Sequence, residues 1–164
     1  MYREMNTSLE LSQIGSWITV SDTKRNNWCS GNLPTGVLVI TTYPPRECGI
    51  ATFSQDLVLA LNNKFSRSFK ISICALESDT EQHAYPDNVK YALNTDDPRQ
   101  FDSLAVSINN DASIRMVLIQ HEFGLFRNNE RKFRELLTNI TKPIIIVFHT
   151  VLPDPDEMLR VKVS

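Results

Sequence analysis

The chain has 164 residues, of which 41% are hydrophobic and 22% charged, and its formal net charge is −2. This length suits one globular domain, which buries roughly two-thirds of the surface that its unfolded chain exposes. The charge argues against a nucleic-acid partner, because no excess of Lys and Arg is available to neutralise phosphates.

The cellular compartment is suggested by features that the sequence lacks. Its longest apolar run, 144–148, is far shorter than the ~20 residues of a membrane span. The N-terminus carries Arg3, Glu4 and Glu10 without an apolar run behind them, so it does not resemble a secretory signal. The three cysteines have no C-x-x-C spacing, which argues against a disulfide framework or a structural zinc site. We expect a cytoplasmic protein, and no feature of the sequence identifies peripheral contact with a membrane.

Residues 1–34 differ in composition from the rest of the chain. They are rich in Asn and Ser and hold one short apolar patch, 9–20. We interpret them as a polar N-terminal extension, the alternative being an amphipathic segment that docks on the domain or on a partner. Residues 35–164 form the domain itself. Residues 156–160 have the composition of a first helical turn, which predicts that the domain is truncated at the start of a helix.

From Gly36 onward, apolar strands alternate with amphipathic helices. The predicted elements in chain order are a strand at 37–40, a helix at 50–61, strands at 69–75 and 89–93, a helix at 98–108, a strand at 116–119, a helix at 133–140 and a strand at 144–148. This alternation predicts an α/β, Rossmann-like, doubly wound parallel sheet with strand order 3-2-1-4-5. The runs 37–40, 116–119 and 144–148 are apolar on both faces, and we expect them at the centre of the sheet.

The turn after the first strand is the first candidate binding element. In an open parallel sheet, ligands bind beyond the carboxyl ends of the strands, where the winding direction reverses. Gly49 either allows the backbone to approach a ligand, with the helix start holding an anion such as a phosphate, or merely permits a tight turn. The spacing matches neither GxGxxG nor GxxxxGK[ST], which disfavours nucleotide binding through those motifs.

Two of the three histidines follow neighbouring strands of the predicted sheet. His121 comes after the fourth strand and His149 after the fifth, so both should lie on the rim that holds Gly49. A single histidine there is explained by ordinary hydrogen bonding, whereas the pair beside a glycine turn favours a site. His83, in the polar loop 77–88, is expected to be solvated.

Cys48 permits two further hypotheses, both disfavoured. It could share a zinc ion with His121, Glu122 and His149, but the spacing matches no known metal motif. It could also be a nucleophile with one of the histidines as base, although a small cysteine buried in a turn is commoner.

Three motifs in this order resemble the N-terminal domain of family 4 glycosyltransferases, which are retaining enzymes of the GT-B fold. They cover residues 42–53 after the first strand, 120–124 after the fourth and 148–153 after the fifth. The resemblance extends over 36–155 and implies one half of a GT-B fold. In that family the N-terminal domain binds the acceptor, and a C-terminal domain, absent from this chain, binds the nucleotide-sugar donor.

The resemblance implies a role for each matching residue. His149 would be the catalytic residue, in contact with the transferred sugar. Gly49, Ile50 and Ala51 would border the donor phosphates. The acceptor side and the cleft would be formed by Tyr43, Arg46, His121, Glu122, Gly124 and Thr150. No metal or cofactor is implied, since the nucleotide sugar is a substrate.

The sequence therefore predicts the acceptor-side domain of an enzyme that transfers a sugar, with retention, to a carbohydrate or another hydroxyl acceptor. Without the donor-binding domain, the chain should be inactive and should self-associate through the surface that this domain would cover. The alternatives are a stand-alone sugar- or nucleotide-binding module and an inactive truncated relative. A receiver-type signalling domain is disfavoured, because the acidic cluster and the phosphorylatable Asp that it requires are missing after the first and third strands.

Overall fold

The computed structural model describes residues 35–65 and 68–150. Strands and helices alternate along them in the order β1 (Thr35–Thr41), α1 (Gly49–Phe65), β2 (Phe69–Glu77), β3 (Val89–Asn94), α2 (Pro98–Asn110), β4 (Met116–His121), α3 (Glu130–Asn139) and β5 (Ile144–Phe148). Every predicted element is present, within a few residues of its expected bounds. The predicted N-terminal extension and the helix start expected at 156–160 lie outside the described residues.

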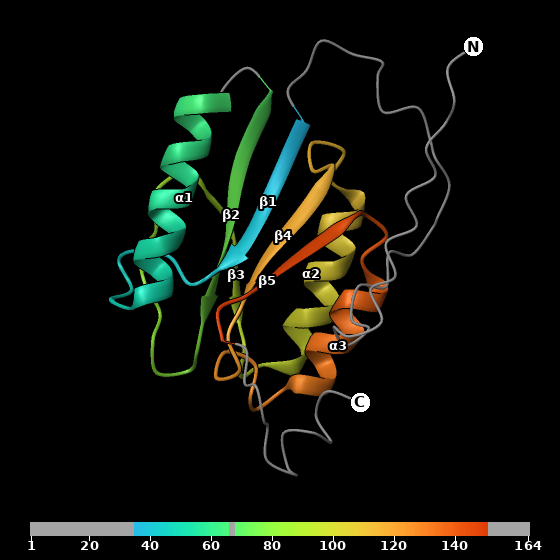
Figure 1. The fold of residues 1–164 in the computed structure, drawn as a ribbon. Coiled ribbons are helices and arrows are strands. Elements are labelled where there is room, and N and C mark those ends of the chain that lie inside the picture. The colour runs from blue at the N-terminus through green and yellow to red at the C-terminus, as the bar shows by residue number, and fades with distance from the viewer. Residues whose placement is uncertain (1–34, 66–67, 151–164) are drawn as a thin grey trace, which may run out of the picture. The chain divides into compact units, whose positions relative to one another are not determined.

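The strands form one parallel sheet with the order β3-β2-β1-β4-β5 (Figure 1). The predicted α/β Rossmann-like fold and its strand order are therefore confirmed. The winding direction reverses between β1 and β4, so the carboxyl ends of these two strands mark the position where such sheets bind ligands.

The hydrophobic core has two parts, one on each face of the sheet. Between the sheet and α1 lie Val39 and Ile73, with Val58 contributed by the helix. On the other face, Leu38 and Phe101 belong to a larger cluster that joins α2 and α3 to the sheet. Successive residues of β1 alternate between the two parts of the core. The continuous apolar run at 37–40 is therefore buried on both faces of the sheet.

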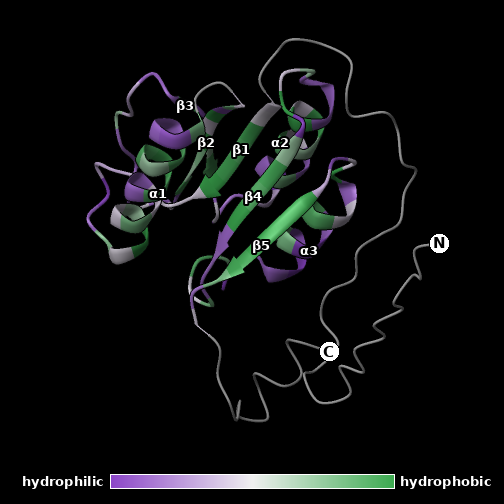
Figure 2. Ribbon diagram, turned by 45° about the horizontal axis from the view of Figure 1, so that its top comes forward, coloured by the Kyte–Doolittle hydropathy of each residue, from purple (hydrophilic) through white to green (hydrophobic). Residues whose placement is uncertain are grey.

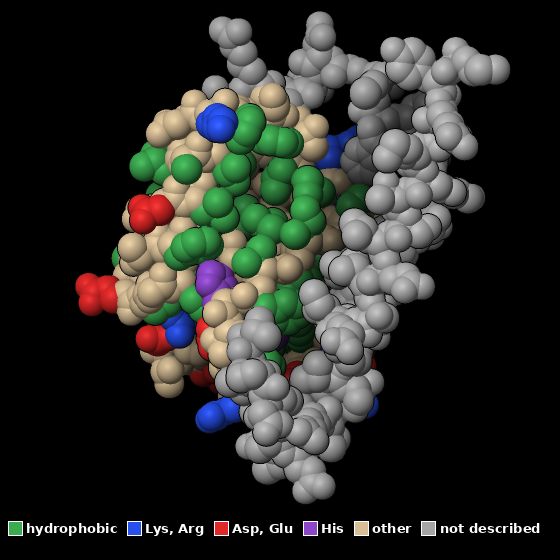
Figure 3. Space-filling model, viewed as in Figure 1, with side chains coloured by type: hydrophobic (Ala, Val, Ile, Leu, Met, Phe, Trp, Pro, Cys, Tyr) green, Lys and Arg blue, Asp and Glu red, His purple; other side chains and the backbone are tan. Residues whose placement is uncertain are grey.

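β5 lies at the edge of the sheet, so the expectation that 144–148 occupy its centre is wrong. Ile145 is 48% exposed and Phe148 53% exposed, although β5 is hydrophobic along its whole length (Figure 2). Helix α1 packs over β1 and β2, and no described helix covers β4 and β5 on that face. Figure 3 shows the hydrophobic side chains gathered on this side of the molecule.

None of the described helices is long and apolar enough to cross a membrane.

Candidate functional site

A cavity of about 480 Å³ opens at the carboxyl rim of the sheet. Four segments line it: the loop after β1, the end of β2, the loop after β3 and the loop after β4. The lining residues are Arg46, Leu76, Glu77, Ser78, Thr80, Thr95, Asp96, Glu122, Gly124, Leu125, Arg127 and Asn128. Most of these side chains are polar, and both charges are represented. The cavity therefore suits a ligand that carries several hydroxyl or other hydrogen-bonding groups.

Hydrogen bonds to Asp96 fix the cavity wall formed by the loop after β3. The Asn128 side chain donates to one carboxylate oxygen of Asp96 at 2.8 Å, and the Asp79 backbone N–H donates to the other at 3.0 Å. These bonds, led by that of Asn128, lower the pKa of Asp96 below its usual value. The carboxylate thus stays ionised at the edge of the cavity, between the backbone of Asp79 and the side chain of Asn128.

Arg46 connects two loops of the rim. Its guanidinium lies 2.8 Å from the carboxylate of Glu81, which belongs to the loop between β2 and β3. Glu77, at the end of β2, accepts a hydrogen bond of 3.1 Å from the backbone N–H of His83 in the same loop. Arg127, from the loop after β4, also lines the cavity and is exposed.

The segment after β5 is hydrogen-bonded to the segment after β4. The backbone N–H of His149 donates to the carbonyl of His121 at 3.0 Å, which extends the ladder between the two strands. The hydroxyl of Thr150 donates to Glu122 at 2.9 Å. Since Glu122 lines the cavity, this hydrogen bond links Thr150 of the third motif to the cavity wall.

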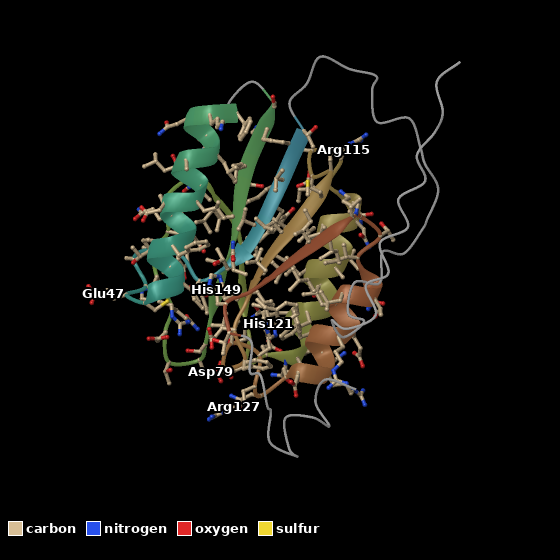
Figure 4. The ribbon with its side chains drawn as sticks, in the orientation of Figure 1. Glu47, Asp79, Arg115, His121, Arg127 and His149 are labelled. Carbon is tan, nitrogen blue, oxygen red and sulfur yellow. The ribbon has the colours of Figure 1, made fainter. Side chains whose placement is uncertain are left out.

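The side chain of His149 lies on the α1 face of the sheet. Its ring meets the ring of Phe53 edge to face, with centroids 5.1 Å apart, and its Nε2 lies 2.7 Å from Oε1 of Gln120. Figure 4 places it beside the first turns of α1. The position after a strand, predicted from the sequence, thus brings this histidine to the start of the helix that follows β1.

His121 occupies the opposite face of the sheet. Its ring lies 5.2–5.8 Å from four phenylalanine rings, which are Phe123, Phe126, Phe133 and Phe148. Burial among these rings lowers the pKa of His121, while Glu122 and Glu130 oppose this shift. The two histidines share one rim, as expected, but the sheet separates their side chains.

Gly49 is the first residue of α1, followed by Ile50 and Ala51. A Cβ at Gly49 would meet no heavy atom within 4 Å, and the backbone is not in the left-handed region that favours glycine. The turn therefore does not require a glycine for its own geometry. The space beside it is open, and the first N–H groups of a helix have no partner within the helix.

The structure also places three further residues named in the sequence analysis. Tyr43 is only 5% exposed, and its hydroxyl accepts a hydrogen bond from Asn88, so its side chain belongs to the core and not to the cavity. Cys48 has its Sγ 3.3 Å from the hydroxyl of Thr42. His83 packs its ring against Tyr85 with Nε2 buried, so the expectation that it is solvated is wrong.

Within 35–65 and 68–150, no group of three or more His, Cys, Asp or Glu side chains is arranged to hold a metal ion.

Several cavity residues were not singled out from the sequence, among them Glu77, Ser78, Asp96 and Asn128. Glu77 ends β2, Ser78 follows it and Asp96 follows β3, so the rule that ligands bind beyond the carboxyl ends of strands could have pointed to them. Asn128 lies in the loop between β4 and α3, and it becomes a neighbour of Asp96 only through the fold of that loop.

No protein-family model matches the chain, and neither does any curated protein. Among solved structures, an alpha-glucosyltransferase in complex with UDP and a 13-mer DNA containing a central A:G mismatch aligns with it at 10% identity and a TM-score of 0.46. The alignment covers 79% of this chain and 33% of that chain, so this chain spans about a third of that protein's length. At this identity and score, the likeness supports no argument about function.

Proposed function

We propose that this chain is the acceptor-side half of a retaining glycosyltransferase of the GT-B fold. The observation that carries the proposal is that the three motifs resembling this family meet at one rim. Arg46 of the first motif and Glu122 of the second line the same cavity, and Thr150 of the third donates its hydroxyl to Glu122. Residues more than a hundred positions apart are thereby joined around a space large enough for a sugar.

In this proposal the cavity binds the acceptor. Carboxylates such as Glu122 accept hydrogen bonds from sugar hydroxyls, whereas Arg127 and Asn128 donate to hydroxyl or ring oxygens. A carbohydrate, which presents many such groups in a small volume, fits this mixed lining better than an apolar molecule does.

The donor would approach from the α1 side of the rim. The start of α1 at Gly49, Ile50 and Ala51 supplies backbone N–H groups and the positive end of a helix dipole, both suited to a diphosphate. His149, beside these first turns, would contact the transferred sugar. A second domain would hold the nucleotide, and closing the two domains would exclude water from the reacting groups.

The experiment is to join the chain to the donor-binding domain of a family 4 enzyme and to measure sugar transfer from a panel of nucleotide sugars. We expect His149→Ala to lower the rate on the order of 100-fold, without a matching fall in the thermal midpoint. Glu122→Gln should weaken binding of the acceptor and so raise its KM. Asp56→Asn is the control, since Asp56 is an exposed carboxylate of α1 that lies outside the cavity.

Two results would contradict the proposal. Loss of activity in His149→Ala explained by a lower midpoint would make His149 a structural residue. Sugar binding by the chain without transfer in any joined form would indicate a binding module instead.

A further inference from the structure

Gln120 is a fully buried amide that follows four apolar residues of strand β4. By the alternation of side chains along a strand, it faces the α1 side of the sheet, as Met116 and Leu118 do. Burying an amide is costly unless its hydrogen bonds are made inside the protein. The partner that the structure supplies is His149, whose Nε2 lies 2.7 Å from Oε1 of Gln120. Within the described residues, Nε2 of Gln120 has no partner.

Three contacts fix the position of His149. Its backbone N–H is held by the carbonyl of His121, its ring packs edge to face on Phe53, and its Nε2 meets Gln120. The contact with Gln120 determines which ring nitrogen of His149 carries the proton. A carbonyl oxygen can only accept, so the ring nitrogen that faces it must carry the hydrogen. In the neutral ring, the lone pair then resides on Nδ1.

We propose that Gln120 is a positioning residue that holds His149 as the Nε2–H tautomer and so makes Nδ1 a hydrogen-bond acceptor for a ligand hydroxyl. The tautomer follows from the orientation of the Gln120 amide, which turns Oε1 towards the ring, and needs no assumption about the reaction. Its catalytic meaning rests on the proposed function: Nδ1 would accept a hydrogen bond from a hydroxyl of the transferred sugar and orient that sugar for attack.

The first test is nitrogen-15 NMR of the whole chain with labelled histidine, at about pH 8.5, where an ordinary imidazole is neutral. The chain has three histidines, and variants lacking His83 or His121 assign the remaining signal. We expect His149 to carry its proton on Nε2, protected from exchange with water. Gln120→Met, which keeps the length of the side chain but removes the acceptor, should abolish this protection and allow both tautomers.

Gln120→Glu and Gln100→Met provide the comparison. Glu restores an acceptor at the same position and should restore the protected Nε2–H signal. The side-chain oxygen of Gln100 also accepts a hydrogen bond, of 2.9 Å, from the backbone N–H of Asn94. This contact does not involve His149. Replacement of Gln100 by Met should leave the His149 signal unchanged.

In the joined enzyme, Gln120→Met should lower kcat on the order of 10- to 100-fold, and Gln120→Glu should recover part of it. A proton on Nδ1 in the wild-type chain, or a Gln120→Met variant with an unchanged tautomer, would overturn the proposal. If Gln120→Met does not fold, the wild-type and Gln120→Glu spectra still decide. Absence of sugar transfer beside an Nε2–H tautomer would count against the proposed function alone.

Discussion

At the scale of single residues, Gly36 shows how closely the backbone segments of this fold approach one another. A Cβ built at Gly36 would lie 1.6 Å from the carbonyl oxygen of Ser113, a backbone atom that cannot move away as a side-chain end can. The carbonyl of Gly36 also accepts a hydrogen bond of 2.7 Å from the backbone N–H of Arg115. Any side chain at this position must therefore separate β1 from the segment that leads into β4.

We expect Gly36→Ala to destabilise the chain by at least about 2 kcal/mol, because overpacking here displaces backbone. Urea unfolding followed by circular dichroism measures the change. Gly124→Ala is the matched control: a Cβ there would meet nothing within 4 Å, so its midpoint should stay near that of the wild type. Equal losses in both variants would contradict a role for the close approach of Ser113.

His121 should make stability depend on pH. Burial lowers the pKa of His121 in the folded chain below the value of about 6.5 that an unfolded imidazole has. In the window between these two values, the unfolded chain binds more protons, so stability rises with pH. The contribution of the neutral ring is complete above about pH 6.5 and is lost as the pH falls through the folded pKa.

The measurement compares urea midpoints of the wild type and of His121→Phe at about pH 7.5 and pH 5, on either side of the unfolded value. Phe keeps an aromatic ring in the cluster with Phe126 and Phe133 but cannot be protonated. The wild type should lose more stability than the variant on acidification. An equal loss in both would show that the ring of His121 does not stay neutral through burial.

At the scale of elements, side-chain patterns predicted which segments are strands but not all of their neighbours. The run at 144–148 is apolar on both faces, yet Ile145 is 48% exposed on the α1 side, where no described helix covers β5. An apolar run therefore identifies a strand without showing what covers its faces or whether a second strand pairs along its other edge. Among the described residues, β5 pairs only with β4.

The candidate site could also be predicted only in part from the sequence. The topology placed His121 and His149 on one rim, and this was correct. Their faces follow from a finer rule: side chains alternate along β4, so Gln120 and His121 must point to opposite sides of the sheet. The side chain of His149 contacts the side chain of Gln120 and not that of His121. The sequence carried that information, whereas the hydroxyl of Tyr43 accepts its hydrogen bond from Asn88, a partner 45 positions away that no local pattern specifies.

The loop after β4 could not be derived from local patterns either. Between Phe126 and the start of α3 this loop holds Arg127, Asn128 and Asn129. Asn129 is the N-cap residue of α3 but makes no side-chain cap hydrogen bond. Its side chain donates instead to the carbonyls of Thr95 and Asp96, which fastens the start of α3 to the loop after β3. One wall of the cavity is built by this tertiary contact.

At the scale of the whole molecule, the described residues bring one Rossmann-like unit to the proposed reaction. They place the cavity, the start of α1 and His149 along one rim. On the α1 side, β4 and β5 have no described helix over them, and Ile145 is 48% exposed there. Self-association through exposed surface stays a prediction of the sequence.

The last prediction concerns what the 164-residue chain does on its own. In the proposed transferase, the leaving diphosphate and the transferred sugar must be held against the acceptor while water is excluded. In that proposal the rim binds the acceptor, but none of the described residues stands opposite it to fix the nucleotide, so the reacting groups would not be held in line. We expect no transfer above background when the purified chain is incubated with several nucleotide sugars and candidate acceptors. The same chain joined to a donor-binding domain should gain activity, and His149→Ala should remove it. Transfer that co-purifies with the unjoined chain and disappears in His149→Ala would overturn the half-site proposal, because the single unit would then hold both substrates.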